Sequence, residues 1–223
     1  DWMMSASSNA AAGTVQKHLI LLAHFTDRYP VSAEEEKDFF KSHSAKELGE
    51  IFERAMQDPV KRNSLNPDQL RQGSFFTSYG KRQVAGRGSY ARPEQLVKFL
   101  FLLEAGNLVD TWSSQEIKRL MYMTQRRIRY ASHPALYDSA VYFKSGSFYK
   151  CSQRGACKKY EGDVLNRLAS VVIIETPVNH EKGIPALRYA VAVMSNVLRV
   201  NSAVAHQTLA LRIHRMLERV HKN

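Results

Sequence analysis

A chain of 223 residues with 44% hydrophobic and 24% charged residues is long enough for one ordinary globular domain with a sizeable core. No apolar run reaches the roughly 18–20 residues that a membrane helix needs. The net charge of +11 leaves three interpretations open: a solvated basic surface, attraction to an anionic polymer such as cell wall or a membrane surface, or nucleic acid. The basic residues are scattered and no nucleic-acid motif accompanies them, so we expect no nucleic-acid partner.

The first half of the chain predicts helices and one long loop. A buried helix is expected over residues 14–25. Ser32 can cap the next helix, which has three glutamates in its first turn. A third helix is expected over residues 44–56. Residues 58–88 are rich in Pro and Gly and are expected to be loop-like.

Two further helices follow this loop. One has Pro93 in its first turn and ends at Gly106. The other is expected to be capped by Ser113 or Ser114 and to extend to Met123.

Strand patterns begin after Ser139. We expect strands over residues 140–143, 169–175 and 187–194, with antiparallel pairing because the connecting segments are short and rich in turn residues. The chain then closes with a helix that Asn201 or Ser202 would cap. We expect its apolar side to carry five residues: Val204, Thr208, Leu211, Met216 and Leu217.

This order of elements predicts an α+β fold in which an antiparallel sheet is packed with helices. We expect a single domain over residues 1–223, with a helical part over about 1–135 and a three-stranded sheet plus a C-terminal helix over about 138–222.

Cys151 and Cys157 have five residues between them in a Ser-, Gly- and Lys-rich stretch. Two cysteines without neighbouring histidines cannot complete a tetrahedral zinc site, so no metal site is predicted. A disulfide closing a small loop is favoured over two free thiols if the compartment is oxidising.

Two short motifs contain residue types that carry chemistry. Ser7-Ser8-Asn9 precedes small residues and the first helix, and Lys144-Ser145-Gly146-Ser147 ends the first predicted strand. Taken separately, the first could simply cap a helix, Lys144 could be a solvated lysine of an edge strand, and Ser145-Gly146 could be a turn.

Taken together, these motifs resemble the S-x-N and K-[ST]-G boxes of the serine β-lactamase and penicillin-binding protein superfamily, which includes D-Ala-D-Ala carboxypeptidases. The resemblance covers essentially the whole chain and implies the C-terminal part of a β-lactamase/transpeptidase-like fold, with the N-terminal portion absent. It implies a serine acyl hydrolase that forms an acyl-enzyme and needs no cofactor.

The resemblance also implies a role for each residue of the two boxes. Ser7 would relay a proton to the leaving nitrogen, and Asn9 would bind the amide side chain of the substrate. Lys144 would supply positive potential near the substrate carboxylate, to which Ser145 would donate its hydroxyl. Gly146 would keep the strand bare for substrate, and the backbone N–H of Ser147 would form half of the oxyanion hole.

Two departures from the family pattern limit this interpretation. The nucleophile box, Ser-x-x-Lys, is expected upstream of residue 1, in a missing segment of the same protein. The strings Ser78-x-x-Lys81 and Ser147-x-x-Lys150 are not expected to open helices. Where class A β-lactamases have a deacylating Glu, the nearest string begins with Arg62, which favours a peptidase-like role.

The expected partners and location follow from this interpretation. The substrate would be a peptide or a β-lactam, the cell wall a possible partner, and the location periplasmic or otherwise extracytoplasmic in a bacterium. The resemblance leaves open whether this chain alone is active. The alternatives are a non-catalytic β-lactamase-like binding module and a basic protein that binds anionic polymers.

Overall fold

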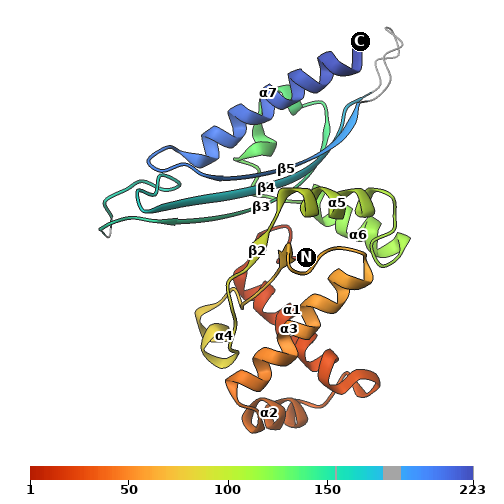
Figure 1. Ribbon diagram of the computed structural model, residues 1–223. Coiled ribbons are helices and arrows are strands. Elements are labelled where there is room, and N and C mark those ends of the chain that lie inside the picture. Colours follow the sequence, from red (N-terminus) through yellow and green to blue (C-terminus); the bar gives the residue numbers. More distant parts are fainter. Residues whose placement is uncertain (154, 178–186, 223) are drawn as a thin grey trace. The chain divides into compact units, whose positions relative to one another are not determined.

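Figure 1 shows the computed structural model of the protein, which describes residues 1–153, 155–177 and 187–222. The chain divides into two compact units. We call the first the sheet unit; it consists of Asp1, Met3–Ala6 and the chain from Leu96 onward. The second, which we call the helical unit, consists of Trp2 and Ser7–Gln95.

The helical unit is built around three helices: α1 (Asn9–Phe25), α2 (Ala33–Ser42) and α3 (Ala45–Arg62). The caps of α2 and α3 are reciprocal, because Ser32 pairs with Glu35 and Ser44 with Glu47 in full capping boxes. The buried core of this unit joins residues of all three helices and of the following segment: Ile20, Leu21, Phe39, Leu48, Ile51, Phe52, Phe75 and Val84.

The segment predicted to be loop-like contains more structure than expected. Helix α3 continues through Pro59 to Arg62, and the short helix α4 (Ser78–Gln83) follows, capped by the side chain of Thr77. Two-residue strands β1 (Leu70–Arg71) and β2 (Tyr90–Ala91) pair antiparallel. The Gly and Pro content predicted a loop, and these elements are too short to give a clear sequence pattern of their own.

The sheet unit contains helices α5 (Pro93–Glu104) and α6 (Thr111–Tyr122) and a three-stranded antiparallel sheet in the order β3-β4-β5. The strands are β3 (Ala140–Lys150), β4 (Leu165–Glu175) and β5 (Arg188–Asn196). Helix α7 (Ser202–Lys222) follows. The predicted α+β architecture is therefore confirmed.

Within this unit, α7 lies on one face of the sheet and α5 and α6 lie on the other (Figure 1). The side chains of successive residues along β3 and β4 point alternately to the two faces of the sheet. Val141 and Phe143 pack with residues that include Ala210 of α7, whereas Tyr142 and Ile173 pack with the α5–α6 side. Helices of the same unit therefore pack on both faces of the sheet, whereas the second half of β3 is exposed.

Strand β3 is longer than expected and contains the whole second motif. Pairing with β4 continues without a break from Ala140↔Glu175 through Lys144↔Val171 to Lys150↔Leu165. The prediction that Lys144-Ser145-Gly146-Ser147 ends the strand is therefore wrong, because these residues lie in its middle.

Two helix details also differ from the prediction. Asp110, not Ser113 or Ser114, caps α6, because its carboxylate accepts from the Ser113 N–H at 2.6 Å. On α7, Val204 and Met216 are exposed, and the buried positions are Ser202, Ala203, His206, Ala210 and His214. Hydropathy pointed to the wrong face because the two buried histidines bond to side chains of the sheet, as described below.

Among the described residues, no helix combines the length and the apolar character needed to cross a membrane.

Candidate active site

Strand β3 presents the second motif on both of its faces. By the alternation of a strand, Lys144 and Gly146 share the face of Tyr142, toward α5 and α6. Ser145 and Ser147 share the face of Phe143, toward α7. One face of the strand therefore carries the ammonium of Lys144 and Gly146, which has no side chain. The other face carries the hydroxyls of Ser145 and Ser147.

Arg129, which sequence reasoning did not single out, is bonded to both of these hydroxyls. Its Nη1 donates to Oγ of Ser145 at 2.6 Å and its Nη2 to Oγ of Ser147 at 2.8 Å. The guanidinium also lies 5.2 Å from the ring centroid of Tyr160. The sequence signal was the alternation Arg127-x-Arg129 just before β3, which was treated only as basic surface.

The Arg129 side chain is a buried cation to which the described residues offer no carboxylate partner. The residue is only 5% exposed. None of the ion pairs among the described residues includes it, and its Nε has no hydrogen-bond partner there. Buried charges are normally paired, so this guanidinium makes the β3 hydroxyls a favourable place for an anion.

Tyr160 responds to the same charge. Burial by itself would raise the pKa of the Tyr160 phenol, but the hydrogen bond and the charge of Arg129 outweigh burial and lower it. The phenol and the guanidinium therefore interact directly inside the sheet unit.

Lys144 lies in a partly desolvated position. Burial, followed by the nearby charges of Arg129 and Arg126, lowers the pKa of its ammonium to about 8. Its Nζ donates to the backbone carbonyl of Ser145 at 3.0 Å. A lysine with a pKa near neutrality can supply positive potential or exchange a proton close to physiological pH.

On the edge of β3 that faces away from β4, hydrogen bonds from side chains occupy the backbone carbonyls as far as Ser145. The carbonyl oxygens of Val141, Phe143 and Ser145 accept hydrogen bonds from Arg127, Thr124 and Lys144, respectively, all outside the β3–β4 ladder. Since the backbone groups of alternate residues point the same way in an antiparallel strand, Ser147 directs its N–H and C=O toward this edge as well.

Gly146 lies on an open part of the strand. A Cβ placed on Gly146 would have no heavy atom within 4 Å. Packing within the sheet unit therefore does not require glycine at this position, which leaves room for a ligand along the strand.

The first motif belongs to the helical unit. Ser8, not Ser7, caps α1, because its Oγ accepts from the Ala11 N–H at 3.2 Å. Ser7 adopts a left-handed φ of 56°, which is uncommon outside glycine, and Asn9 is the exposed first residue of α1. The two motifs lie in different units, so the approach of Ser7 and Asn9 to Lys144 remains a prediction.

A second buried polar cluster lies beneath the sheet and was also missed by sequence reasoning. Both ring nitrogens of His206 on α7 are hydrogen-bonded, Nδ1 to Oγ of Ser170 at 2.9 Å and Nε2 to Oγ of Ser195 at 2.8 Å. Burial, followed by the charge of Arg129, lowers the His206 pKa to about 4. Ser170 is also the direct β4 partner of Ser145, so this neutral cluster lies next to the arginine site.

The Ser-x-x-Lys string in α4 was predicted not to open a helix, and this prediction is wrong. Ser78 is the first residue of α4. However, Ser78 and Lys81 are both exposed, and neither side chain has a described interaction that would activate a hydroxyl. Ser147 and Lys150, the second such string, lie within β3.

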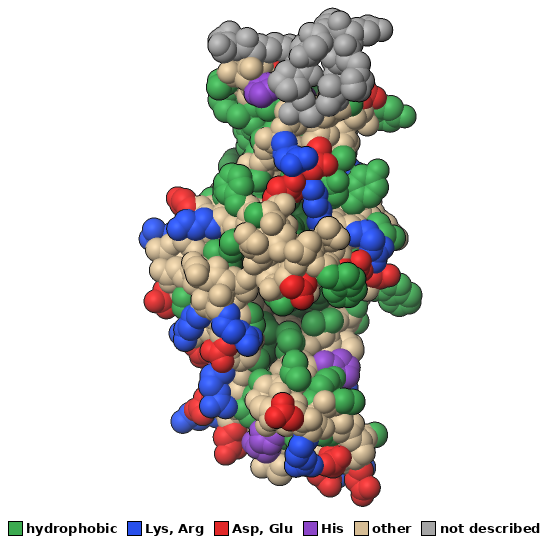
Figure 2. Space-filling model, turned by 90° about the vertical axis from the view of Figure 1, so that its right-hand side faces the viewer, with side chains coloured by type: hydrophobic (Ala, Val, Ile, Leu, Met, Phe, Trp, Pro, Cys, Tyr) green, Lys and Arg blue, Asp and Glu red, His purple; other side chains and the backbone are tan. Residues whose placement is uncertain are grey.

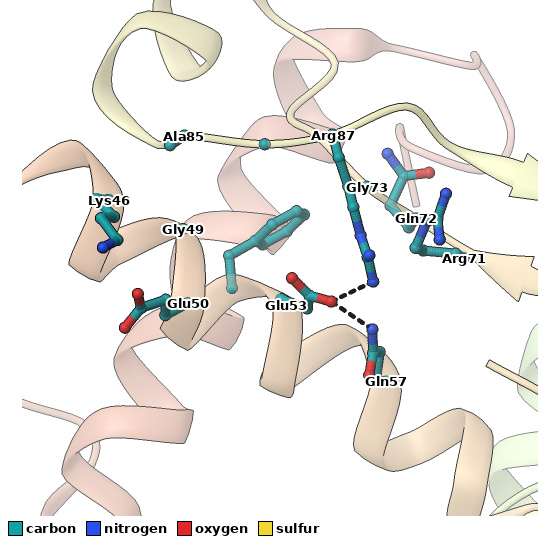
Figure 3. Close-up of a pocket in the computed structure, with 12 residues that line it drawn as sticks. Lys46, Gly49, Glu50, Glu53, Gln57, Arg71, Gln72, Gly73, Ala85 and Arg87 are labelled. Atoms are coloured by element: carbon teal, nitrogen blue, oxygen red, sulfur yellow. Dashed lines mark hydrogen bonds and ion pairs between the residues drawn. The ribbon is translucent and has the colours of Figure 1, made fainter. Parts of the chain in front are cut away.

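A hollow of about 280 Å³ in the helical unit is lined by charged side chains of both signs (Figure 3). Arg87 reaches toward α3, where it forms an ion pair with Glu53, and Gln57 donates to the same carboxylate at 2.7 Å. Lys46 and Glu50 lie on the other side of the hollow (Figure 3). The described lining has no Ser or Cys side chain, and its charged side chains are of both signs, so we assign the hollow no chemistry.

Cys151 and Cys157 form a disulfide just beyond the end of β3. Within the described part of the chain, no three metal-binding side chains converge on one point.

No family model and no curated protein matches the chain in sequence. Solved structures do match its fold. A class A β-lactamase from Bacteroides cellulosilyticus gives a TM-score of 0.52 at 13% identity, with 96% of this chain and 83% of that chain covered. The TLA-3 extended-spectrum β-lactamase gives 0.53 at 14% identity, with 93% and 83% covered.

A β-lactamase from Chitinophaga pinensis gives a TM-score of 0.50 at 17% identity, with 96% of this chain and 84% of that chain covered. At such low identities, these similarities establish the fold alone. The protein has a β-lactamase-like α+β fold, as the sequence motifs predicted.

Proposed function

We propose that the protein is a serine acyl hydrolase of the β-lactamase or D-Ala-D-Ala peptidase type. The observation that carries this proposal is the buried Arg129, which holds the hydroxyls of Ser145 and Ser147 on a strand that also bears Lys144. In a β-lactamase-like fold, this is a ready site for a substrate carboxylate. The nucleophile would come from a Ser-x-x-Lys box upstream of this chain.

Hydrogen-bond directions support a role in carboxylate binding. Because Arg129 donates to Oγ of Ser145 and of Ser147, each hydroxyl keeps its own proton available to donate to an anion. Lys144 adds positive potential from the other face of the strand. Charge-assisted hydrogen bonds of this kind are about twice as strong as neutral ones.

The acyl transfer itself would use the strand edge and the first motif. The nucleophile oxygen attacks the carbonyl carbon of the amide or β-lactam, and the C–N bond breaks as Ser7 passes a proton to the leaving nitrogen. Asn9 holds the amide side chain of the substrate. The Ser147 N–H stabilises the oxyanion, and water later cleaves the acyl ester and returns the proton to the nucleophile.

The cell-wall and extracytoplasmic assignments belong to the same proposal. A disulfide between Cys151 and Cys157 suits an oxidising compartment. On the face shown in Figure 2, Lys and Arg side chains are interspersed with Asp and Glu instead of forming one basic patch. That face does not favour the alternative of a basic protein that binds anionic polymers.

A non-catalytic binding module is the second candidate. The observation that favours it is the exposure of Ser78 and Lys81, which gives this string no activating environment. Such a module would use Arg129, Ser145 and Ser147 to bind a carboxylate without forming an acyl-enzyme.

Labelling of the natural full-length polypeptide with a fluorescent penicillin separates the two candidates. A catalytic protein either acquires a covalent label that survives denaturation and is blocked by prior treatment with unlabelled penicillin, or hydrolyses the labelled penicillin. A binding module shows reversible binding in solution but no label after denaturation. Absence of both would contradict the carboxylate site and with it the proposal.

A further inference from the structure

A separate hollow in the sheet unit lies beside the outer edge of β3. It has a volume of about 570 Å³ and is lined by residues from the end of α6 to the start of β3, within 122–139. Small-molecule sites commonly have volumes of about 300–1,000 Å³. None of the residues assigned to the acyl-transfer site lines it, so any ligand it holds would be a different one.

Arg127 places a partly buried cation in this hollow. Its Nη1 donates to the carbonyls of Tyr122 and Val141 at 3.3 and 3.2 Å. Burial lowers the pKa of the guanidinium, and the interaction with Tyr122 offsets this only in part. No ion pair among the described residues includes Arg127.

The Arg127 guanidinium keeps donors available for a ligand. It has five N–H groups in a planar fork that matches a carboxylate. The hydrogen bonds found among the described residues use only Nη1. The fork is also held in place by the two carbonyls, which reduces the entropy lost on binding.

The other described residues of the lining are aromatic, apolar or uncharged serines, and none of them is acidic. Tyr122 and Tyr137, which are 54% and 89% exposed, line the hollow together with Pro134 and the buried Leu136. His133 also lines it. Tyrosine rings offer flat surfaces for another ring, and the absence of Asp and Glu favours a negative charge.

We propose that this hollow is a binding site for an aromatic carboxylate, in which Arg127 binds the carboxylate and the rings of Tyr122 and Tyr137 contact the aromatic group. The site is independent of the proposed acyl-transfer function. We expect binding to require both the carboxylate and the ring. The contact with Arg127 alone is weak, and the aromatic surface alone is open to solvent.

Ligand-observed ¹⁹F NMR on the full chain tests this with three probes. We expect 4-fluorobenzoate to broaden on addition of protein. Neutral 4-fluorobenzamide has the ring without the charge and trifluoroacetate has the charge without the ring, so both should stay sharp. Equal broadening by 4-fluorobenzamide or trifluoroacetate, or no broadening by 4-fluorobenzoate at millimolar concentration, overturns the proposal.

Variants locate the binding site. Arg127→Gln should weaken 4-fluorobenzoate binding about tenfold or more, since it removes a charged hydrogen-bond partner. Arg212→Gln, an exposed arginine of α7 in the same unit, is the matched control and should leave binding unchanged. Tyr137→Ala changes a side chain that is 89% exposed, so it tests the aromatic contact without threatening the fold and should weaken binding several-fold.

A thermal melt of Arg127→Gln checks that the variant is folded. If Arg127→Gln or Tyr137→Ala binds 4-fluorobenzoate like the wild type, the proposal fails. It also fails if Ser145→Ala abolishes binding while Arg127→Gln keeps it, because the probe would then occupy the Arg129 site. The penicillin-labelling result has no bearing on any of these outcomes.

Discussion

Arg129 donates a hydrogen bond of 2.6 Å to Ser145 beneath strand β3, and it has no carboxylate partner among the described residues. This pair joins a buried positive charge to a hydroxyl in the middle of a strand. Burying such a charge is unfavourable unless something compensates for it. A substrate carboxylate would provide that compensation.

Replacement of Arg129 by Gln should therefore reduce carboxylate recognition. We expect the second-order rate of penicillin acylation of the full-length protein to fall about 10- to 100-fold, in line with the loss of a charged hydrogen bond. The rate with the methyl ester of the same penicillin should change much less. Equal losses with the acid and the ester would show that Arg129 does not contact the carboxylate.

Ser7 and Ser8 should have separable roles. If Ser7 relays a proton, Ser7→Ala should lower the acylation rate roughly 100-fold or more while changing stability little. Ser8→Ala is the matched control: loss of the α1 cap should cost about 1 kcal/mol in urea unfolding and leave the rate nearly unchanged. A Ser7→Ala variant with the wild-type rate would remove Ser7 from the mechanism.

His206 should make the protein less stable in mild acid. Its pKa is lowered to about 4 in the folded state from the usual 6.5, so the unfolded chain takes up a proton first as the pH falls. The contribution of neutral His206 to the free energy of unfolding is therefore fully present above about pH 6.5 and is lost progressively toward pH 4. In urea unfolding between pH 4 and pH 7, His206→Gln should have a lower free energy of unfolding than the wild type at pH 7. Its free energy of unfolding should also fall less steeply as the pH is lowered. A fall as steep as that of the wild type would refute the assignment.

Gly49 on α3 should be required by close packing. A Cβ at this position would lie 2.4 Å from the carbonyl oxygen of Ala85, whereas a Cβ at Gly88 would have no heavy atom within 4 Å. Gly49→Ala should therefore destabilise the protein by about 1–3 kcal/mol despite the higher helix propensity of alanine. Gly88→Ala should change the free energy of unfolding by less than about 0.5 kcal/mol, and comparable values for the two variants in urea unfolding would contradict this packing.

The architecture could be predicted from sequence where local signals are strong. Ser32 and Ser44 begin helices with reciprocal glutamate caps, and the β-rich segments pair antiparallel as expected. The end of β3 was missed because Lys144-Ser145-Gly146 has the composition of a turn, and only pairing with β4 keeps it extended.

The candidate site was only partly predictable. The Lys144 motif was visible as a string of residues, but Arg129 was not, because its burial depends on hydroxyls 16 and 18 positions away in the sequence. The buried face of α7 was misassigned for a related reason. His206 and His214 read as polar in the sequence, but each is hydrogen-bonded inside the unit, to Ser170 and Ser195 and to Tyr189.

The central claim is that this fold carries out acyl transfer, and the intact mass of the natural full-length protein after incubation with benzylpenicillin tests it most directly. Our account predicts a mass increase equal to one whole penicillin molecule, strongly reduced in Arg129→Gln and absent in the presence of excess competing β-lactam. An unchanged mass under saturating penicillin, with the protein folded and the penicillin not hydrolysed, would contradict the account.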